Sequence, residues 1–489
     1  MDRRQFFGSS IAVAVAASLP YRRLLAADIE AVTGRGTATT LARDDLQALR
    51  DSLRGPLLLP GNTAYDDARR VVNEAIDRHP ALVVQASGAA DVRTAVRFAR
   101  AHDLLLAVKC GGHAHGGQAT CDGGLQLDLS RFHGVRIDTS SQTAYVAGGS
   151  LLGELDHEAM ACGLVTTAGT VSRTGVGGLT LGGGFGRLAR RFGLALDNVK
   201  AVDLVTADGQ LVHASVHENP DLFWGVRGGG GNFGVVTEFQ FALHPMQRQV
   251  IAGNVVFPIA RARELLGFYR DFSLHAPDEL YTDCVISAVP GKDGVFVIQA
   301  VYSGTATQAD TVLAPLHKLG TPIANTIRSK DYVDVQRAGD RTDPRTENAY
   351  GRSGFVDGFK AGLEAAIMDG FEPRPDRQTL LFFQHAGGAI GRVAPDATAF
   401  PHRRGTHNML LRISWPLEQA GTQHARYGED YWRSLQRFTD GWYTNEVSDE
   451  SPDIVEGNYQ ANLKRLQALK NKHDPGNLFR LNANVRPTV

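Results

Sequence analysis

The chain has 489 residues, 43% of them hydrophobic and 21% charged, and its formal net charge is -1. This length corresponds to about three domain-sized units, and the composition supports hydrophobic cores of ordinary size. A nearly neutral charge argues against a nucleic-acid-binding protein, because such proteins carry an excess of basic residues.

The first residues have the pattern of an export signal. Arg3 and Arg4 precede a mildly apolar run of small residues at 8–19, and Leu25-Ala26-Ala27 resembles a cleavage site. Residues 1–27 are therefore expected to be a bacterial twin-arginine signal peptide that engages the twin-arginine export machinery. The alternative is an ordinary anchor or a chance arginine pair. The run is shorter than the ~20 residues that span a bilayer, so we expect a soluble mature protein without a stable membrane anchor, periplasmic or secreted.

A short β–α–β unit is expected next. Residues 82–84 and 104–108 are apolar runs typical of strands, and the helix between them, at 90–102, has Ser87 as its expected cap. Further strands are expected at 125–129, half-buried by its alternation, and at 143–147. A helix capped by Ser150 should end before Gly163.

A glycine loop follows the second strand: Lys109-Cys110-Gly111-Gly112-His113-Ala114-His115-Gly116-Gly117. Glycines after a strand leave backbone N–H groups bare, which suits the phosphates of a nucleotide. His113 adds a nucleophilic imidazole. His115 could be a supporting partner or half of a metal-binding pair, but no third ligand lies nearby in the sequence, so no metal site is expected.

Two further glycine blocks, at 175–186 and 228–234, point to a large flat cofactor held by backbone. The first of these blocks is not a Rossmann fingerprint, because it has no well-placed GxGxxG between a strand and a helix and no acidic residue at the expected offset. The alternative is a glycine-rich region of structural value only. Between the blocks, residues 199–206 and 210–214 predict a hairpin, and Asn219-Pro220-Asp221 predicts a helix start.

After about residue 250 the pattern changes to alternating strands with helices between them. Strands are expected at 253–257, 282–287, 295–302, 379–385 and 409–415, and helices at 260–271, 309–317 and 427–438. This order fits an antiparallel sheet with helices on one face. Residues 336–360 are expected to be an irregular surface loop over a pocket, and residues 461–472 a helix.

The four cysteines, Cys110, Cys121, Cys162 and Cys284, have no metal-like spacing. Buried free thiols are the favoured interpretation. In an oxidising compartment one pair could form a disulfide, for example Cys110 with Cys121.

The chain resembles the berberine bridge enzyme-like family of FAD-linked oxidases, within the p-cresol methylhydroxylase / vanillyl-alcohol oxidase superfamily. Four stretches in order carry the resemblance: Gly111-Gly112-His113, the block at 175–186, NPDLFWGVRGGGGNFGVV at 219–236, and the tail at 462–487. It implies an α+β fold with a two-subdomain FAD-binding domain of the p-cresol methylhydroxylase type at 28–250. An antiparallel-sheet substrate domain follows at 251–440, and a C-terminal segment at 441–489 returns to the FAD domain.

The resemblance also implies FAD bonded covalently through its 8α-methyl group to His113. Many relatives carry a second bond from a cysteine, but that position falls at Val171 and Cys162 does not align, so no second, cysteinyl link is expected. A small residue at Thr174, the position that gates oxygen, favours an oxidase over a dehydrogenase. The other expected cofactor-binding residues are Lys109, Cys110, Gly111, Gly112, Gly117, Gly175, Gly178, Gly182, Val236 and Asn482.

Flavin oxidation of an alcohol needs a base within hydrogen-bond reach of the hydroxyl group. By resemblance, the candidates are Glu446 and Tyr443, although relatives often have an aromatic residue where Glu446 stands. A surface acid and a core aromatic are the alternatives. Asn408 and Arg412 share one face of a strand with Leu410 and are further candidates. Gln384-His385 could form a pocket wall or be structural.

These features predict an exported FAD-dependent oxidase that takes a hydride from a CH–OH or C–N carbon of a small organic substrate and reduces dioxygen to hydrogen peroxide. The alternatives are a dehydrogenase that uses a quinone or another acceptor, and a flavin-bearing binding protein without turnover. Sugars, phenolic alcohols and amines all remain open as substrates.

Overall fold

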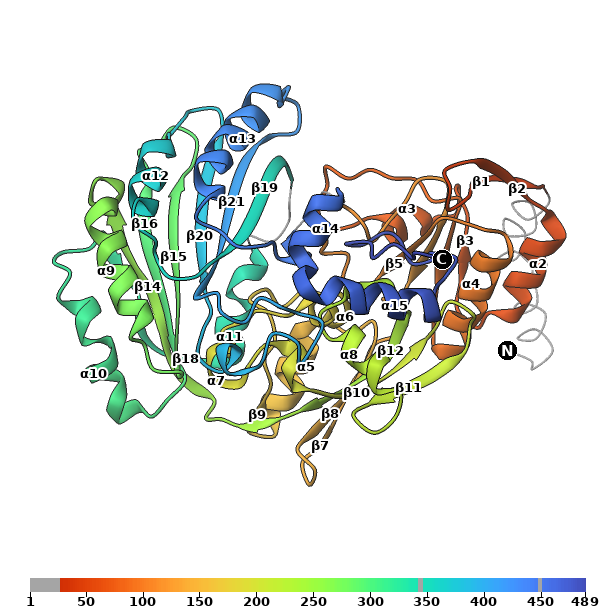
Figure 1. The fold of residues 1–489 in the computed structure, drawn as a ribbon, viewed down its shortest axis with the longest axis horizontal. Helices are drawn as coiled ribbons and strands as arrows, with labels where there is room; N and C mark the ends of the chain where they lie inside the picture. The colour runs from red at the N-terminus through yellow and green to blue at the C-terminus, as the bar shows by residue number, and fades with distance from the viewer. Residues whose placement is uncertain (1–26, 342–345, 447–450) are drawn as a thin grey trace, which may run out of the picture.

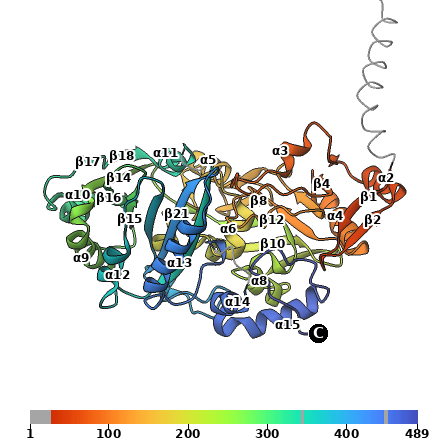
Figure 2. The ribbon, with the colours of Figure 1, turned by 90° about the horizontal axis from the view of Figure 1, so that it is seen from above.

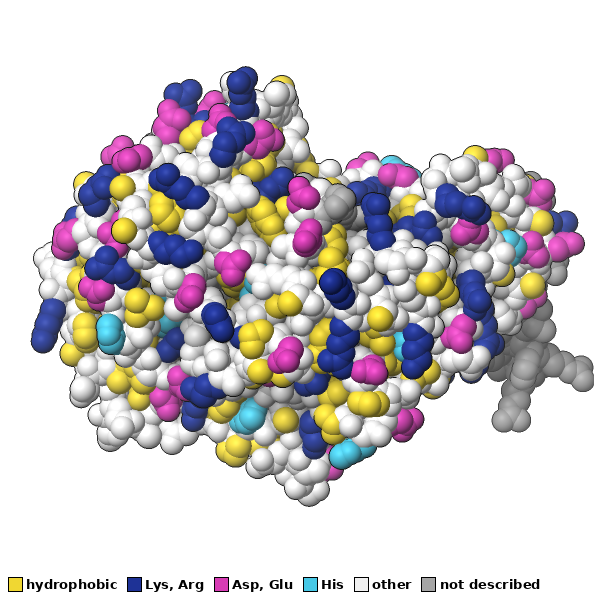
Figure 3. Space-filling view, in the orientation of Figure 1, with side chains coloured by type: hydrophobic (Ala, Val, Ile, Leu, Met, Phe, Trp, Pro, Cys, Tyr) yellow, Lys and Arg dark blue, Asp and Glu magenta, His cyan; other side chains and the backbone are white. Residues whose placement is uncertain are grey.

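The computed structural model describes residues 27–341, 346–446 and 451–489 (Figure 1). The expected signal peptide at 1–27 lies outside these residues except for its last position. No helix within the described ranges has the length and apolar character needed to cross a membrane. Basic and acidic side chains are interspersed over the face shown in Figure 3, in keeping with the net charge of -1.

The N-terminal part contains a four-stranded sheet in the order β3-β4-β6-β5. Its strands are β3 Leu57–Leu58, β4 Leu82–Gln85, β5 Leu106–Lys109 and β6 Leu125–Asp128. β4 and β5 both run parallel to β6. Helix α4, Ala89–Ala101, connects β4 to β5 and buries Val92, Ala95, Val96 and Ala99, as its periodicity predicts. The smaller elements around this sheet are β1 Ile29–Val32, β2 Ala38–Leu41, α2 Arg43–Ser52 and α3 Tyr65–Arg69.

Two local predictions in this sheet were wrong. Ser87 does not cap α4; the cap position is Gly88, and the carboxylate of Asp91 instead accepts hydrogen bonds from the backbone N–H groups of Ser87, Arg54 and Gly55. β6 is buried along its whole length rather than half-buried. A central strand with parallel neighbours is covered on both faces, and its polar Gln126 and Asp128 find internal partners.

A five-stranded antiparallel sheet follows, in the order β11-β10-β12-β8-β7. Its strands are β7 Val135–Asp138, β8 Thr143–Ala147, β10 Val199–Val205, β11 Leu211–Ser215 and β12 Val235–Ala242. β10 and β11 form the predicted hairpin. The accompanying elements are α5 Leu152–Ala161, α6 Val176–Gly182, α7 Ala189–Phe192, α8 Pro220–Val226, and the pair β9 Leu164–Val165 and β13 His244–Pro245.

The predicted start of α8 and the predicted end of α5 are correct, but the predicted capping side chains are not. α8 begins at Pro220 as expected, while the side chain of Asn219 donates to the carbonyl of His213 instead of capping the helix. α5 ends before Gly163 as expected, but its cap position is Leu151; the hydroxyl of Ser150 bonds to the backbone of Gly134.

An eight-stranded antiparallel sheet forms the rest of the molecule. It comprises β14 Gln249–Pro258, β15 Leu280–Ala288, β16 Val295–Tyr302, β17 Ala324–Asn325, β18 Arg328–Asp331, β19 Glu347–Val356, β20 Gln378–His385 and β21 His407–Pro416. Helices α9 Ala262–Leu274, α10 Ala306–His317, α12 Leu363–Gly370 and α13 Thr422–Gln436 cover one face (Figure 2). α11, Tyr332–Arg337, packs instead against α5 of the N-terminal part.

The prediction of an irregular surface loop at 336–360 was wrong. Residues 347–356 form strand β19, which pairs along its length with β21. The strand was not recognised because its sequence is largely polar and contains glycine. Only at its end, at Gly354, Phe355 and Val356, are the residues both non-polar and buried. Helix α12 was also missed.

The C-terminal segment returns to the N-terminal part. It contains helices α14 Pro452–Tyr459 and α15 Leu463–His473, and α15 lies beside α8 (Figures 1 and 2). Tyr459, Leu466, Leu469 and Val485 join the core of the five-stranded sheet. The domain boundaries expected at 27, 250 and 440 stay predictions.

Among the described residues all four cysteines are free thiols, so Cys110 and Cys121 form no disulfide. Burial raises the pKa of the Cys110 thiol to about 11 and that of Cys121 to about 12. Cys162, expected to be buried, is exposed because it lies at the C-terminal end of α5.

Candidate active site

A cavity of about 380 Å³ lies between the glycine-rich segments and the eight-stranded sheet. The sheet contributes Gln384, and the C-terminal segment contributes Tyr443, Thr444, Asn445 and Glu446. The other wall carries His113, and the three glycine blocks contribute backbone to it at Gly111, Gly112, Gly175, Gly177, Gly178, Gly230, Gly231 and Gly234.

The first two glycine blocks touch each other directly. A Cβ atom at Gly111 would lie 2.4 Å from the backbone nitrogen of Gly175, and one at Gly175 would lie 2.4 Å from the nitrogen of Gly111. Only glycine fits at either position, because a Cβ this close to backbone cannot be relieved by moving a side chain. This contact brings the His113 loop and the loop before α6 into one continuous wall.

Gly178 has the opposite character. A Cβ there would meet no protein atom within 4 Å, although the residue lines the cavity. The space in front of Gly178 belongs to the cavity itself, so the wall can accept a flat molecule that approaches the backbone closely.

Most of the expected cofactor-binding residues line this cavity. They are Cys110, Gly111, Gly112, His113, Thr174, Gly175, Gly178, Val236 and Asn482.

Three expected residues lie behind the wall. Lys109 donates from Nζ to the carbonyl of Ala68 at 2.6 Å, Gly117 adopts a left-handed φ of +72° against Ile76, and Gly182 packs against the side chain of Asn445. These residues shape the loops from outside the cavity.

Two ionisable side chains meet at the cavity wall. Nε2 of His115 lies 3.0 Å from Oε2 of Glu446, and the two side chains are 28% and 26% exposed. His115 comes from the first glycine loop and Glu446 from the C-terminal segment, so the pair joins two distant parts of the chain. A carboxylate held by an imidazole at the edge of a cavity can accept a proton from a bound molecule.

Tyr443 contributes a different kind of polar group. Its hydroxyl accepts hydrogen bonds from the backbone N–H of Gly184 at 3.0 Å and from Nδ2 of Asn445 at 2.9 Å. Burial raises the pKa of Tyr443 to about 12, so the phenol keeps its proton at neutral pH. Tyr443 is therefore suited to donate a hydrogen bond into the cavity, whereas Glu446 is suited to act as the base.

Asn408, which was expected in the site, does not line the cavity. It is 2% exposed, and its Nδ2 donates to Oε1 of Gln384 at 3.4 Å. The two residues are paired across β20 and β21, and Gln384 is the one that lines the cavity. Arg412, on the same strand face, is partly buried; burial lowers its pKa, and the charges of Glu347 and Glu446 oppose that effect.

Sequence reasoning missed several lining residues. Gln118 lies at the end of the glycine loop, and Asn445 stands between the two acid–base candidates, so their positions in the sequence could have indicated them. Leu179, Phe185, Leu481 and Ala483 are further lining residues without any chemical signal in the sequence. Within the described residues, no group of three or more His, Cys, Asp or Glu side chains could hold a metal ion.

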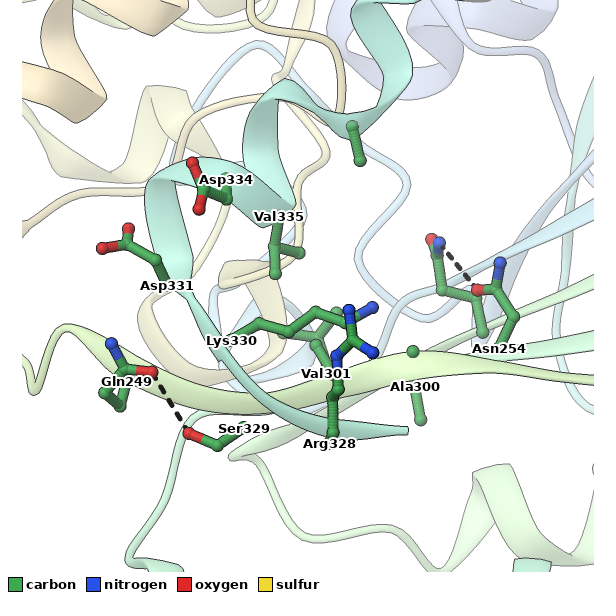
Figure 4. A pocket seen from close by; sticks show the side chains of 14 residues that line it. Gln249, Asn254, Ala300, Val301, Arg328, Ser329, Lys330, Asp331, Asp334 and Val335 are labelled. Carbon is green, nitrogen blue, oxygen red and sulfur yellow. Dashed lines mark hydrogen bonds between the residues drawn. The ribbon is translucent and has the colours of Figure 1, made fainter. Parts of the chain in front are cut away.

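A second hollow, of about 500 Å³, lies between α11 and strands β14, β16 and β18 (Figure 4). Its polar side chains include Arg328, Lys330, Asn254 and Gln299, and Oδ1 of Asn254 accepts a hydrogen bond from Gln299. Burial and the neighbouring charge of Arg328 lower the pKa of Lys330. This hollow has a single glycine in its lining, so it lacks the bare backbone wall of the first cavity.

Comparison with known proteins agrees with this geometry. Residues 80–215 match the family model "FAD binding domain", and residues 442–486 match "Berberine and berberine like". An FAD-linked oxidoreductase of Dictyostelium discoideum is 33% identical over 443 residues, which cover 89% of this chain and 96% of that protein. The chain belongs to the berberine bridge enzyme-like family of FAD-linked oxidoreductases.

Solved structures give the same fold. The crystal structure of 6-hydroxy-D-nicotine oxidase from Arthrobacter nicotinovorans has a TM-score of 0.82 and 28% identity, and covers 89% of this chain and 98% of that one. A carbohydrate oxidase from Microdochium nivale, solved with a substrate analogue, has a TM-score of 0.82 and 26% identity over 91% of this chain and 100% of that one. The α+β fold with an FAD-binding domain of the p-cresol methylhydroxylase type is thereby confirmed.

The cavity fits FAD by its construction. Gly111 and Gly175 exclude any Cβ, and Gly178 leaves its space to the cavity. Bare glycine backbone allows close approach by a flat ring and by phosphates. The residues that would hold the cofactor line this cavity: Cys110, Gly111, Gly112, His113, Thr174, Gly175, Gly178, Val236 and Asn482.

Proposed function

We propose that the protein is an exported FAD-dependent oxidase whose cofactor is bonded to His113. It oxidises a CH–OH or C–N carbon of a small organic substrate and reduces dioxygen to hydrogen peroxide. The observation that carries the proposal is the meeting of His113, on a glycine-lined wall, with the Glu446–His115 pair in one cavity. No second, cysteinyl link is expected, since Val171 lines the cavity and exposed Cys162 is not among the lining residues.

Bound FAD would supply a hydride acceptor for the substrate carbon and a two-electron donor for dioxygen. The protein supplies the proton transfer. Glu446 takes the proton from the substrate hydroxyl or amine, and His115, at 3.0 Å, holds the carboxylate in place. The phenol of Tyr443 donates a hydrogen bond to the substrate heteroatom, and Gln384 contributes an amide from the sheet.

Denaturing gel electrophoresis tests the covalent link. In-gel flavin fluorescence should survive in the wild type and in His115→Ala, and should vanish in His113→Ala, because only His113 is proposed to form the bond. His115 is the matched control because it lies two residues away on the same loop. A wild-type band without fluorescence would contradict the proposal.

Two alternatives are distinguished by the electron acceptor. After anaerobic reduction by a substrate, rapid reoxidation of the flavin in air with release of peroxide supports an oxidase. Slow reoxidation in air with rapid reduction of a quinone dye would instead identify a dehydrogenase. A flavin that no candidate substrate among sugars, phenolic alcohols and amines can bleach would favour a binding protein without turnover.

Export is the remaining part of the proposal, and it is supported by Arg3 and Arg4 ahead of a short apolar run. Cell fractionation should find the protein outside the cytoplasm. The double variant Arg3→Lys, Arg4→Lys should accumulate inside, because the export machinery recognises the arginine pair. Unchanged export of the double variant would overturn this part.

A further inference from the structure

The loop at 169–175 forms the cavity wall next to the second glycine block. Thr170, Val171, Thr174 and Gly175 all line the cavity. Two of the loop's hydrogen bonds come from its own half of the molecule, since the N–H groups of Leu152 and Gly153 at the start of α5 donate to Thr174 and Ser172. The other end of the loop is held by side chains from a different part of the chain.

Gln336 on α11 provides one of these contacts. Its side chain is buried, and its Nε2 donates to the carbonyl of Gly169 at 2.9 Å and to Oδ2 of Asp156 at 3.1 Å. Its Oε1 accepts a hydrogen bond from Nη1 of Arg187 at 2.9 Å. A carboxylate has no N–H group to donate to Gly169 and Asp156, and an apolar side chain could make none of the three hydrogen bonds. This position therefore needs an amide.

Arg187 extends the contact to the next residue of the loop. The same Nη1 atom donates to the carbonyl of Thr170 at 2.9 Å, so two successive loop carbonyls are held from one cluster. Arg187 is 6% exposed. A guanidinium buried to this degree is held in a fixed orientation by its hydrogen bonds.

Asp340, four residues after Gln336, holds the middle of the loop. Its carboxylate accepts hydrogen bonds from the backbone N–H of Ser172 at 3.1 Å and from the Ser172 hydroxyl at 2.6 Å. Gly339 approaches the loop so closely that a Cβ atom would lie 3.3 Å from the carbonyl of Thr170. Residues 336–340 therefore contact the loop at several successive positions between Gly169 and Ser172.

The cluster also reaches the eight-stranded sheet. Asp156 on α5 and Asp283 on β15 are both buried, and burial raises the pKa of each to about 7, while the charge of Arg187 opposes the rise in both cases. Asp283 is paired with Gln384 across β15 and β20, and Gln384 lines the cavity. The charge of Arg187 thus acts on the strand next to the one that carries Gln384, and α11 itself packs against β18 and β14 of the same sheet.

We infer that Gln336 is a positioning residue that holds the flavin-facing loop at 169–175 in register with the sheet. This inference rests on the proposed function in that the loop is taken to face bound FAD. Gln336 touches neither cofactor nor substrate; it acts through Gly169 and through Arg187. Displacement of such a wall by about 1 Å can change the rate of a reaction by roughly a hundredfold.

The test compares Gln336→Met with Asp334→Asn. Methionine has a similar size but makes none of the amide's hydrogen bonds, and Asp334 is an exposed residue on the same helix. In Gln336→Met, hydrogen exchange of residues 169–175 should be at least about tenfold faster, because the opening of the loop loses buried hydrogen bonds. Asp334→Asn should exchange like the wild type.

Flavin measurements on the holoprotein give the second readout. Gln336→Met should keep its in-gel fluorescence, but its midpoint potential should shift and its reoxidation in air should change by about fivefold or more, while Asp334→Asn matches the wild type. A folded Gln336→Met variant with unchanged loop exchange, potential and reoxidation would show that Gln336 only packs the two halves together, and would overturn the inference.

If Gln336→Met does not fold, Asp340→Asn supplies the test through Ser172. It should give faster exchange at 170–174 and a smaller flavin shift, and an unchanged loop would overturn the inference. The proposed function fails separately, through a non-fluorescent wild type or a flavin that no substrate reduces. Hydrogen exchange of the loop does not depend on either result.

Discussion

The two walls of the active-site cavity are built on opposite principles. The wall that carries His113 includes eight glycines of the three glycine blocks, and its shape depends on the absence of side chains at Gly111 and Gly175. The facing wall consists of side chains from the eight-stranded sheet and the C-terminal segment, including Gln384, Tyr443 and Glu446. The first wall is suited to a constant cofactor, whereas the second can change residue by residue with the substrate.

The largest effect is expected from the backbone wall. Gly111→Ala places a Cβ 2.4 Å from the backbone of Gly175, which costs about 3 kcal/mol or more because backbone must move. Purified protein should contain little or no flavin, as measured by the ratio of absorbance at visible and ultraviolet wavelengths. Gly178→Ala is the sharper control: it should fold normally, since no protein atom lies within 4 Å, and lose flavin only by intruding into the cavity. Normal flavin content in Gly111→Ala would contradict this account of the wall.

On the side-chain wall, Glu446→Gln should have the largest effect. Loss of a general base lowers turnover by roughly 10²–10⁴-fold. Flavin content should stay normal, because Glu446 belongs to the other wall, and an amide can still hydrogen-bond to His115. Stopped-flow reduction of the flavin is the measurement, with exposed Glu418→Gln as the control. A rate of reduction within twofold of the wild type would remove Glu446 from its proposed role.

Tyr443→Phe should have a smaller effect, of about tenfold on turnover, with a loss of stability of roughly 1–2 kcal/mol because the N–H of Gly184 loses its buried acceptor. With a pKa of about 12, Tyr443 stays protonated up to pH 10, so the pH profile of turnover between 7 and 10 should keep its shape in the variant. An alkaline limb of the wild-type profile that disappears in Tyr443→Phe would make the tyrosine the base instead.

The smallest effect on turnover is expected from Asp156, at the junction of the two walls, where the expected change is in stability. The pKa of Asp156 is raised from 3.8 to about 7, so the folded protein holds a proton that the unfolded chain releases. The Asp156 carboxyl therefore lowers stability progressively as the pH rises from about 4 to about 7. Asp156→Asn cannot ionise, and its free energy of unfolding relative to the wild type should rise by about 3 kcal/mol between pH 4.5 and pH 8.

Thermal unfolding at the two pH values measures this difference, with Asp334→Asn as a control at an exposed position. Equal melting-temperature differences at pH 4.5 and pH 8 would mean that Asp156 titrates like an ordinary carboxyl.

The sequence indicated residues of both walls, since Gln384, Tyr443 and Glu446 were candidates too, but only for the backbone wall is the physical cause visible in the sequence. Glycine blocks are visible as residue types, and the contact between Gly111 and Gly175 needs glycine at both positions, so the pattern and its cause coincide. The facing wall depends on strand register, because a shift of one residue would turn every side chain of the strand to the opposite face of the sheet. Asn408 was expected in the site, yet its pairing partner Gln384 lines the cavity.

The remaining errors have a similar cause. β19 was expected to be a loop because an edge strand, paired on one side by β21, can carry polar residues such as Glu347, Asn348 and Arg352. Ser87 and Ser150 were expected to cap helices, but Asp91 and Gly134 lie close enough to redirect the local hydrogen bonds. The pairing of His115 with Glu446, 331 positions apart in the chain, has no local signal at all.

The return of the C-terminal segment has a consequence for biosynthesis. Phe479, Leu481, Asn482 and Ala483 line the cavity, and the buried ammonium group of Lys470 ties this segment to the carbonyl of Asn232. The cavity therefore has its full lining only after residues 479–483 have been synthesised and have packed against the N-terminal part. Under the proposed export of the folded protein, FAD would have to be captured after this segment has docked and before translocation.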